Sequence, residues 1–128
     1  MNRRAFLFAG LLLPMAAPVA HAAPDVEMVY VGGWDCPYCT LWQNKYKAHW
    51  LASPEFKQVT WTEVDVPHLR EAYEARYWPG ELKAVLDQIP RKNGTPRFLI
   101  VSKGKLVFNE AGADKWERTI RALKNVLG

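Results

Sequence analysis

The sequence is poor in the side chains that cross-link small proteins or bind metal ions, with two cysteines and three histidines among 128 residues. Two cysteines cannot form a disulfide scaffold of the kind that stabilises small secreted domains. Six tryptophans, five tyrosines and five phenylalanines supply apolar area for a core held by packing. The composition therefore predicts a packed globular domain in which the two cysteines serve another purpose.

Runs of like charge, low-complexity segments and internal repeats are also missing. The 17 basic and 13 acidic side chains are dispersed along the chain, whereas a polyanion-binding surface needs clustered lysines and arginines. We therefore expect no nucleic-acid partner. The sequence also lacks a Ser/His/Asp set, a paired-carboxylate signature and a glycine-rich phosphate loop, so hydrolase and nucleotide-binding chemistry compete poorly.

A long apolar run occurs once, at the amino terminus. Residues 5–17 are almost entirely apolar, follow a short basic start and precede a small-x-small motif, which is the three-part layout of a secretory signal. The run is shorter than the roughly 20 residues that a membrane anchor needs. We expect a signal peptide at residues 1–22, cleaved near Ala22, export to the periplasm, and one mature domain at residues 23–128.

Arg3 and Arg4 are the only charged residues of the expected signal peptide. Adjacent arginines occur in both ordinary and twin-arginine signals, which leaves the export route open. Without these two residues the chain has 15 basic and 13 acidic side chains, a formal charge of +2. Such a mild charge predicts a mixed, solvated surface.

The apolar patterns along the chain predict alternating strands and helices. Four stretches have strand patterns: residues 25–31, 57–64, 97–101 and 105–108. Four have helical spacing or composition: residues 37–50, 69–77, 81–89 and 114–127. We expect Gly32 and Gly33 to end the first strand, and Asp114 with Glu117 to form a capping box on the last helix. The order of elements predicts an α/β fold with a mixed sheet and flanking helices, in one domain.

Both cysteines lie in the stretch GGWDCPYC, residues 32–39, between the first strand and the first helix. A helix start presents unpaired N–H groups and a partial positive charge, which favour the nucleophilic thiolate over the thiol. Cys36 benefits most and is expected to attack a substrate disulfide, while Cys39, one turn later, resolves the mixed disulfide. Asp35 opposes this if its carboxylate faces the sulfur, but it could instead cap the helix.

The cysteine pair could alternatively form a structural disulfide or bind a metal ion. A structural disulfide across so short a loop would stabilise the fold little, because loop-closure entropy rises with loop length. A structural zinc site needs four ligands, and His49 lies about 15 Å from Cys39 along the predicted helix. His68, in a predicted loop, stays open as a third ligand. A reactive dithiol is the favoured reading.

Three features, in this order along the chain, resemble the thioredoxin superfamily. They are the stretch WDCPYC at residues 34–39, the tripeptide at 94–96 that precedes the strand 97–101, and the small residues 111–113 that lead into the last helix. The export signal and the single domain are similar to bacterial periplasmic thioredoxin-like proteins, while the CPYC motif resembles glutaredoxins. The resemblance covers nearly all of the expected mature chain.

The resemblance implies a thioredoxin-like fold and a redox cycle between the Cys36–Cys39 disulfide and the dithiol, with no other cofactor and no metal. It implies that the Thr95–Pro96 peptide bond is cis and that the backbone of Thr95 pairs with an extended substrate segment. Residues around the sulfurs are expected to bind substrate: Trp34, Pro37, Tyr38, Thr95 and Pro96. The chain departs from the family pattern at Tyr30, where many thioredoxins carry a buried aspartate that assists proton transfer.

Together these observations predict an exported thiol–disulfide oxidoreductase acting on protein disulfides, as a reductase or isomerase more than an oxidant. A reductase in an oxidising compartment needs electrons, so we expect a membrane-embedded electron donor beside the protein substrates. No added dimerisation domain is visible, and a monomer is expected. The alternatives are a metal-delivery or partner-binding module on the same fold and a glutathione-dependent enzyme like glutaredoxin, although a full glutathione-binding set is not seen.

Overall fold

A computed structural model describes Gly10 and residues 25–128. The predicted signal peptide and its cleavage site therefore lie outside the described residues, apart from Gly10. No helix among the described residues has both the length and the apolar character that a membrane span requires.

Four strands form one mixed sheet in the order β2-β1-β3-β4. Their bounds are β1 Val26–Gly33, β2 Thr60–Val66, β3 Arg97–Ser102 and β4 Lys105–Ala111. The central strand β1 pairs parallel with β2 and antiparallel with β3, and β3 forms an antiparallel hairpin with β4. Both central strands are buried almost throughout, as the apolar runs at residues 28–31 and 98–101 predict.

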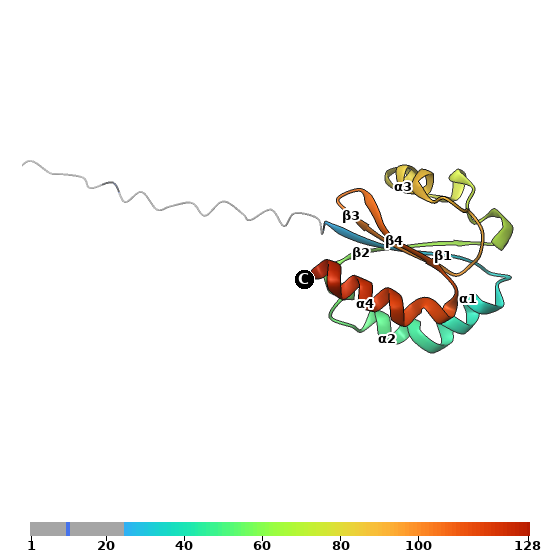
Figure 1. Cartoon of the computed structure of the whole chain (residues 1–128), viewed down its shortest axis with the longest axis horizontal. Helices are drawn as coiled ribbons and strands as arrows, with labels where there is room; N and C mark the ends of the chain where they lie inside the picture. The colour runs from blue at the N-terminus through green and yellow to red at the C-terminus, as the bar shows by residue number, and fades with distance from the viewer. Residues whose placement is uncertain (1–9, 11–24) are drawn as a thin grey trace, which may run out of the picture.

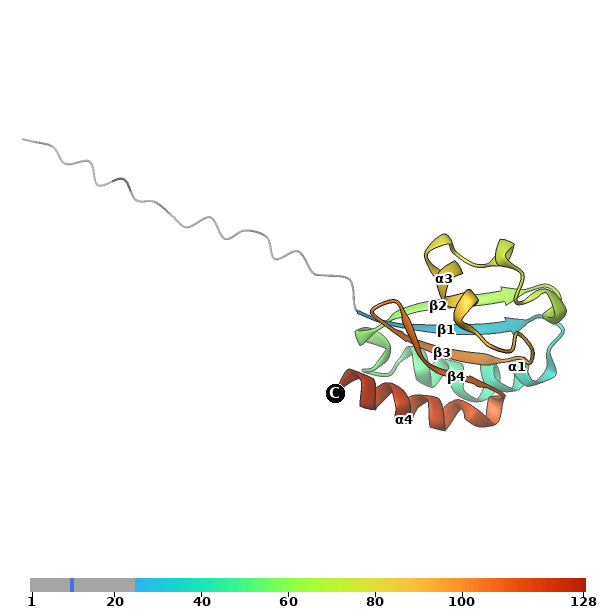
Figure 2. The same ribbon diagram turned by 45° about the horizontal axis from the view of Figure 1, so that its top comes forward.

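Helices cover both faces of this sheet. The helical segments are α1 Pro37–Trp42, a π-helix Gln43–Lys47, α2 Ala48–Leu51, α3 Lys83–Gln88 and α4 Trp116–Leu127. In Figure 1, α1, α2 and α4 lie on one side of the sheet and α3 on the other, and Figure 2 shows the strands between them. The expected α/β fold in a single domain, with a mixed sheet and flanking helices, is confirmed.

The core on the α1/α4 side of the sheet is aromatic. Trp42 is fully buried and stacks on Tyr30 at 4.7 Å between ring centroids, with Trp116 at 5.1 Å and Phe98 at 5.4 Å. Both sulfur-bearing residues belong to the same cluster, Cys36 at 3 % exposure and Cys39 at 1 %. A second cluster of Val, Leu and Ile side chains fills the α3 side. The two cysteines are therefore packed within the aromatic core cluster.

Three local predictions were wrong. β1 continues through Gly32 and Gly33, which pair with Asp65 and Val66 of β2, because glycine keeps its backbone hydrogen bonds in a strand even though it lacks a packing side chain. The expected helix at 69–77 is replaced by two short 3₁₀ turns, Leu69–Glu71 and Ala75–Tyr77.

The capping box on the last helix is also absent from the described residues. A 3₁₀ turn, Ala113–Lys115, precedes α4, so Lys115 occupies the N-cap position and its side chain makes no capping hydrogen bond. Gly112 has φ of 122°, a left-handed conformation, and the tight turn that it permits moves Asp114 out of register with the helix start.

Candidate active site

The two cysteines form a disulfide at the start of the first helix, with 5.2 Å between their Cα atoms. Cys36 is the N-cap residue and keeps an extended backbone, and Pro37 occupies the first helical position, where its missing N–H leaves no partner unsatisfied. The Cys36 Sγ accepts a hydrogen bond from the Cys39 backbone N–H at 3.1 Å. The sulfur thus takes the place of a capping oxygen and receives the charge-stabilising donors of the helix start.

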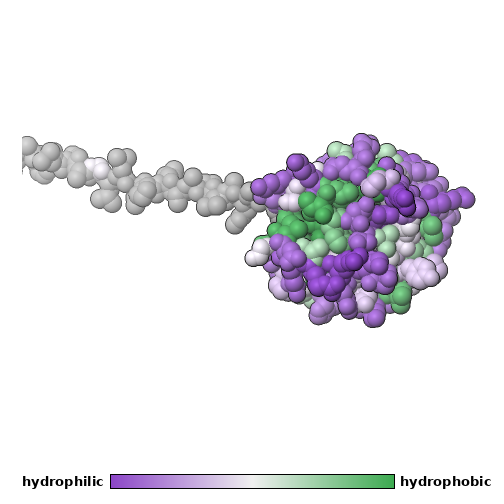
Figure 3. All heavy atoms as spheres, viewed as in Figure 1, coloured by the Kyte–Doolittle hydropathy of each residue, from purple (hydrophilic) through white to green (hydrophobic). Residues whose placement is uncertain are grey.

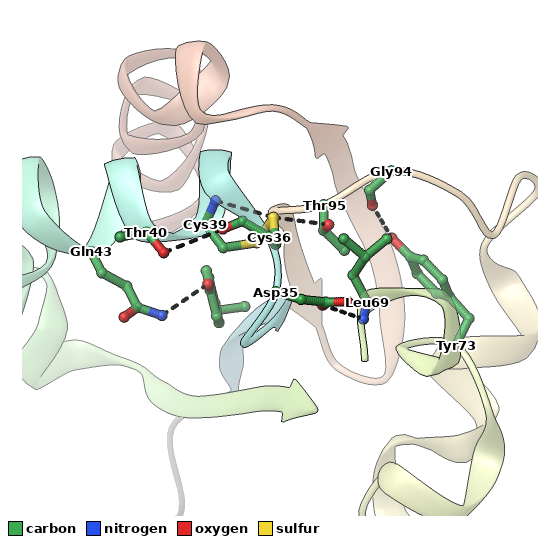
Figure 4. Close-up of a disulfide and its surroundings, with 10 residues drawn as sticks. Asp35, Cys36, Cys39, Thr40, Gln43, Leu69, Tyr73, Gly94 and Thr95 are labelled. Atoms are coloured by element: carbon green, nitrogen blue, oxygen red, sulfur yellow. Dashed lines mark hydrogen bonds between the residues drawn. A yellow bond between two sulfur atoms is a disulfide. The ribbon is translucent and has the colours of Figure 1, made fainter. Parts of the chain in front are cut away.

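A second donor reaches the same sulfur from a distant part of the chain. The Thr95 hydroxyl lies 3.2 Å from the Cys36 Sγ, across 59 residues of sequence. The peptide bond between Thr95 and Pro96 is cis, and Figure 4 shows Thr95 beside the two cysteines. The resemblance predicted a substrate-binding role for the Thr95 backbone, but sequence reasoning missed its hydroxyl, since no local pattern indicates a contact over this separation.

The two glycines before the motif make room for two neighbours. A Cβ on Gly33 would lie 2.7 Å from the Cα of Leu69, and a Cβ on Gly32 would lie 2.4 Å from the Tyr30 hydroxyl oxygen. Both distances are well inside van der Waals contact. Gly33 therefore lets the chain at Leu69 approach the active-site loop, and Gly32 leaves space for the ring tip of Tyr30.

Asp35 turns toward this neighbouring chain. Its Oδ1 accepts a hydrogen bond from the Leu69 backbone N–H at 2.8 Å, and its Oδ2 lies 3.9 Å from the His68 Nδ1. Figure 4 shows the carboxylate directed toward Leu69. Neither alternative from the sequence describes this contact, because Asp35 neither caps α1 nor hydrogen-bonds to the sulfur. Its role is to attach the 3₁₀ turn Leu69–Glu71 to the active-site loop.

Tyr30 occupies the position at which the family resemblance would place a buried aspartate. Its side chain is fully buried, and its hydroxyl accepts a hydrogen bond from the Gln43 amide at 3.2 Å. Burial is the largest cause that raises the pKa of Tyr30 to about 12, and the hydrogen bond from Gln43 acts in the opposite direction. The hydroxyl is therefore neutral throughout the physiological range, and this position adds no negative charge beneath the cysteines.

The raised pKa of Tyr30 predicts a loss of stability at alkaline pH. Above pH 10 the tyrosine ionises in the unfolded chain but keeps its proton in the folded one until about pH 12, so the unfolded state gains stability as pH rises. We expect the free energy of unfolding to fall between pH 10 and 12, and this fall to be smaller in Tyr30→Phe. Urea denaturation at several pH values measures both, and an equal fall in the two proteins would contradict the assignment.

Large apolar side chains surround the disulfide at the surface. Trp34 is 69 % exposed and Tyr38 67 % exposed, and Leu41 and Leu69 are also exposed. Between the first helix and the turn that precedes α4 lies a cavity of about 420 Å³, lined by Tyr38, Leu41, Thr95, Gly112, Ala113 and Asp114. On the face seen in Figure 3, hydrophilic residues frame the apolar areas of the surface. The residues predicted to bind substrate are thus brought together around the sulfurs, and Leu41 and Ala113 are additions that the sequence did not indicate.

Neither histidine of residues 25–128 is hydrogen-bonded to a cysteine sulfur. His49 is in α2, and His68 faces Asp35 at 3.9 Å. Within the part of the chain that the structure describes, no three His, Cys, Asp or Glu side chains gather in a way that could hold a metal ion. The site therefore presents a dithiol–disulfide pair with hydrogen-bond donors and apolar contact surface.

Comparison with known proteins finds similarity in structure only. No family model matches the chain, and no curated protein matches it in sequence. Among solved structures, the long form of spinach chloroplast thioredoxin f is 16 % identical, with a TM-score of 0.55, covering 83 % of this chain and 74 % of that one. Thioredoxin from Malassezia sympodialis (Mala s 13) is 14 % identical, with a TM-score of 0.54 and coverages of 80 % and 78 %.

The periplasmic thioredoxin SoxS from Paracoccus pantotrophus, in its reduced form, is 15 % identical, with a TM-score of 0.52. The similarity covers 79 % of this chain and 98 % of that one. In this chain β1, the cysteine pair at the helix start, the cis-proline before β3 and the closing helix α4 follow one another in that order. The domain at residues 25–128 has the thioredoxin fold.

Proposed function

We propose that this protein is an exported thiol–disulfide oxidoreductase that reduces or isomerises disulfides in other proteins. The observation that carries the proposal is the pair of donors on one sulfur. The Cys36 Sγ accepts hydrogen bonds from the Cys39 N–H and from the Thr95 hydroxyl, and both donors would stabilise a thiolate at this position once the disulfide is reduced. Cys39 is slightly the more buried residue, at 1 % exposure against 3 % for Cys36, and lies one turn further into the helix, which suits the resolving role.

The reaction is a transfer of two electrons by disulfide exchange. The Cys36 thiolate attacks a substrate disulfide, one substrate sulfur leaves as a thiolate and takes a proton from water, and a mixed disulfide remains. The Cys39 thiolate then attacks the Cys36 sulfur, which forms the Cys36–Cys39 disulfide and releases the second substrate sulfur. The substrate gains two electrons, and the oxidised dithiol must be reduced again by another dithiol.

The nature of the two donors supports reduction or isomerisation over oxidation. A backbone amide and a hydroxyl are neutral groups, and no lysine or arginine of residues 25–128 is hydrogen-bonded to either sulfur. A strong oxidant is one whose reduced form is strongly stabilised, and neutral donors stabilise a thiolate less than a lysine or arginine in the same place would. A measured reduction potential of about −120 mV, the value of a strong bacterial oxidant, would contradict a role in reduction or isomerisation.

The location and partners belong to the same proposal. The secretory layout of residues 1–22 supports export, and one structure of the same fold is described as a periplasmic thioredoxin. In an oxidising periplasm a reductase depends on electrons carried across the membrane. We therefore include in the proposal a membrane-embedded dithiol donor, substrates that are proteins with disulfides or thiols, and a monomeric enzyme.

The direct test is turnover of a protein disulfide with dithiothreitol as electron donor. We expect the parent protein to accelerate reduction well above the dithiothreitol background and Cys36→Ser to fall to that background, because serine cannot form the mixed disulfide. Tyr77→Phe, which changes a hydroxyl away from the sulfurs, serves as a folded control. A parent without activity would refute the proposal, and a fully active Cys36→Ser would refute the assignment of the nucleophile.

A further inference from the structure

The most unusual buried group of the described domain is an arginine in the first position of β3. Arg97 is 6 % exposed and follows the cis-proline directly. Its guanidinium donates to the Tyr73 hydroxyl at 2.7 Å, to the Asn109 side chain and to the Asn93 backbone carbonyl. All three acceptors are neutral, and no carboxylate of residues 25–128 forms an ion pair with it.

A buried cation without an acid is costly, and an apolar side chain of similar volume would fill the position with less desolvation penalty. The contacts of Arg97 suggest what the charge achieves. Arg97 and its partner Tyr73 hold the loop that ends in Thr95. Arg97 donates to the Asn93 carbonyl of this loop, and the Tyr73 hydroxyl donates to the Gly94 carbonyl at 2.6 Å. The loop before the cis-proline is thus held at two successive carbonyls.

Tyr73 is the central member of this network. Its hydroxyl accepts from Arg97 and donates to Gly94, and its ring lies under the guanidinium at 5.6 Å. Burial is the largest influence on its pKa, which is raised although Arg97 lowers it. The hydroxyl therefore keeps the proton that it donates to Gly94 at neutral pH.

The chain segment at residues 69–73 also contacts the other active-site loop. Four residues before Tyr73, the Leu69 N–H donates to Asp35, which is adjacent to Cys36. The segment 69–73 thus contacts both loops of the site. Leu69 contacts the cysteine loop at Asp35, and Tyr73 contacts the loop before the cis-proline at Gly94. Figure 4 shows Asp35, Leu69, Tyr73, Gly94 and Thr95 gathered beside the disulfide.

We propose that Tyr73, held by Arg97, is a positioning residue that keeps the Thr95 hydroxyl against the Cys36 sulfur through its hydrogen bond to Gly94. The proposal rests on the proposed disulfide exchange, for which a stabilised Cys36 thiolate is required. Tyr73 touches neither sulfur. It acts through a loop whose last residue before the proline donates to the sulfur at 3.2 Å.

The test measures the thiolate directly. In the full chain carrying Cys39→Ser, so that Cys36 is the only thiol, the rate of alkylation by iodoacetamide is followed against pH. We expect Thr95→Val to move the midpoint of this profile upward by about one pH unit, a tenfold change in thiolate fraction, in the range of one hydrogen bond to a charged group. Tyr73→Phe is expected to move it upward by about half a unit to one unit.

Tyr77→Phe is the matched control, because Tyr77 lies on the same stretch and its hydroxyl donates to Glu71 and not to the cis-proline loop. It should leave the midpoint unchanged. The double variant Tyr73→Phe with Thr95→Val should shift no further than Thr95→Val alone, since Tyr73 acts through Thr95. Arg97→Lys, which keeps the charge but lacks the planar fork, should shift the midpoint in the same direction and serves if Tyr73→Phe does not fold.

Several results would overturn the proposal. An unchanged midpoint in folded Tyr73→Phe would show that its hydroxyl is only structural, and an unchanged midpoint in Thr95→Val would show that the hydroxyl contact has no influence on the sulfur. Additive shifts in the double variant would show that the two residues act separately. Because alkylation needs no protein substrate, these outcomes are distinguishable from a failure of the turnover assay, which would refute the proposed function itself.

Discussion

Replacing Cys39 with serine is expected to stop the reaction halfway and to trap substrates on Cys36. The Cys36 thiolate keeps its donor from residue 39, because that donor is a backbone N–H, and it keeps the Thr95 hydroxyl. Attack therefore proceeds, but no second thiol is present to resolve the mixed disulfide. We expect multiple turnover to fall by about two orders of magnitude or more, with a substrate adduct that survives non-reducing electrophoresis and disappears on addition of dithiothreitol.

The matched control for trapping is Cys36→Ser, which retains a single thiol at the shielded position of Cys39. It should form little or no adduct with the same substrate. Equal adduct formation by the two variants would contradict the assignment of Cys36 as the attacking sulfur, while a stable adduct on Cys39 alone would reverse the two roles. Mass spectrometry of the adduct peptides identifies the sulfur without relying on activity.

The second large effect concerns stability, and Trp42→Ala is expected to destabilise the fold by about 3–5 kcal/mol. Trp42 is fully buried at the end of α1, and its ring contacts those of Tyr30, Phe98 and Trp116. Its removal leaves a cavity in the core cluster that also contains the cysteine pair, and a close-packed interior fills such a cavity only in part. A loss of this size is a large part of the 5–15 kcal/mol that holds a domain of this kind together.

Trp34→Ala provides the matched control, since it removes the same side chain two residues before Cys36 at a site that is 69 % exposed. We expect its free energy of unfolding to change by no more than about 0.5 kcal/mol. Urea denaturation of both variants in the disulfide form measures the difference. Similar losses in the two proteins would show that the aromatic cluster does not support the site as described. Since Trp34 is a predicted substrate contact, the same variant should weaken substrate binding while it remains folded.

The alternating order of elements could be predicted because it depends on local patterns. The continuous apolar residues of 98–101 and the helical spacing of 114–127 each specify one element, and the paired cysteines at a helix start specify a chemistry. Boundaries were predicted less well where glycine and short turns occur. The strand crosses Gly32 and Gly33 because its partner strand β2 supplies the hydrogen bonds, and a partner strand is not visible in local sequence.

The segment at 69–77 shows the same limit. Its composition is helical, yet it forms two 3₁₀ turns. Its Leu69 N–H is bonded to Asp35 and its Tyr73 hydroxyl to Gly94. These tertiary contacts hold the chain at two points four residues apart, and they outweigh a helical preference of a few tenths of a kcal/mol per residue.

The sequence by itself determined the class of fold and the place of the dithiol at the first helix, because each of these follows from periodicity or from spacing within a few residues. Thr95 and Pro96 were expected beside the sulfurs only through the family resemblance. Only the tertiary structure decided where Asp35 points and which hydroxyl reaches Cys36. It also placed Tyr73 and Arg97 behind the cis-proline loop. These contacts join residues that lie 21 to 59 positions apart. They form only when the sheet brings the end of β1 beside the start of β3, so no pattern within a short window of sequence specifies them.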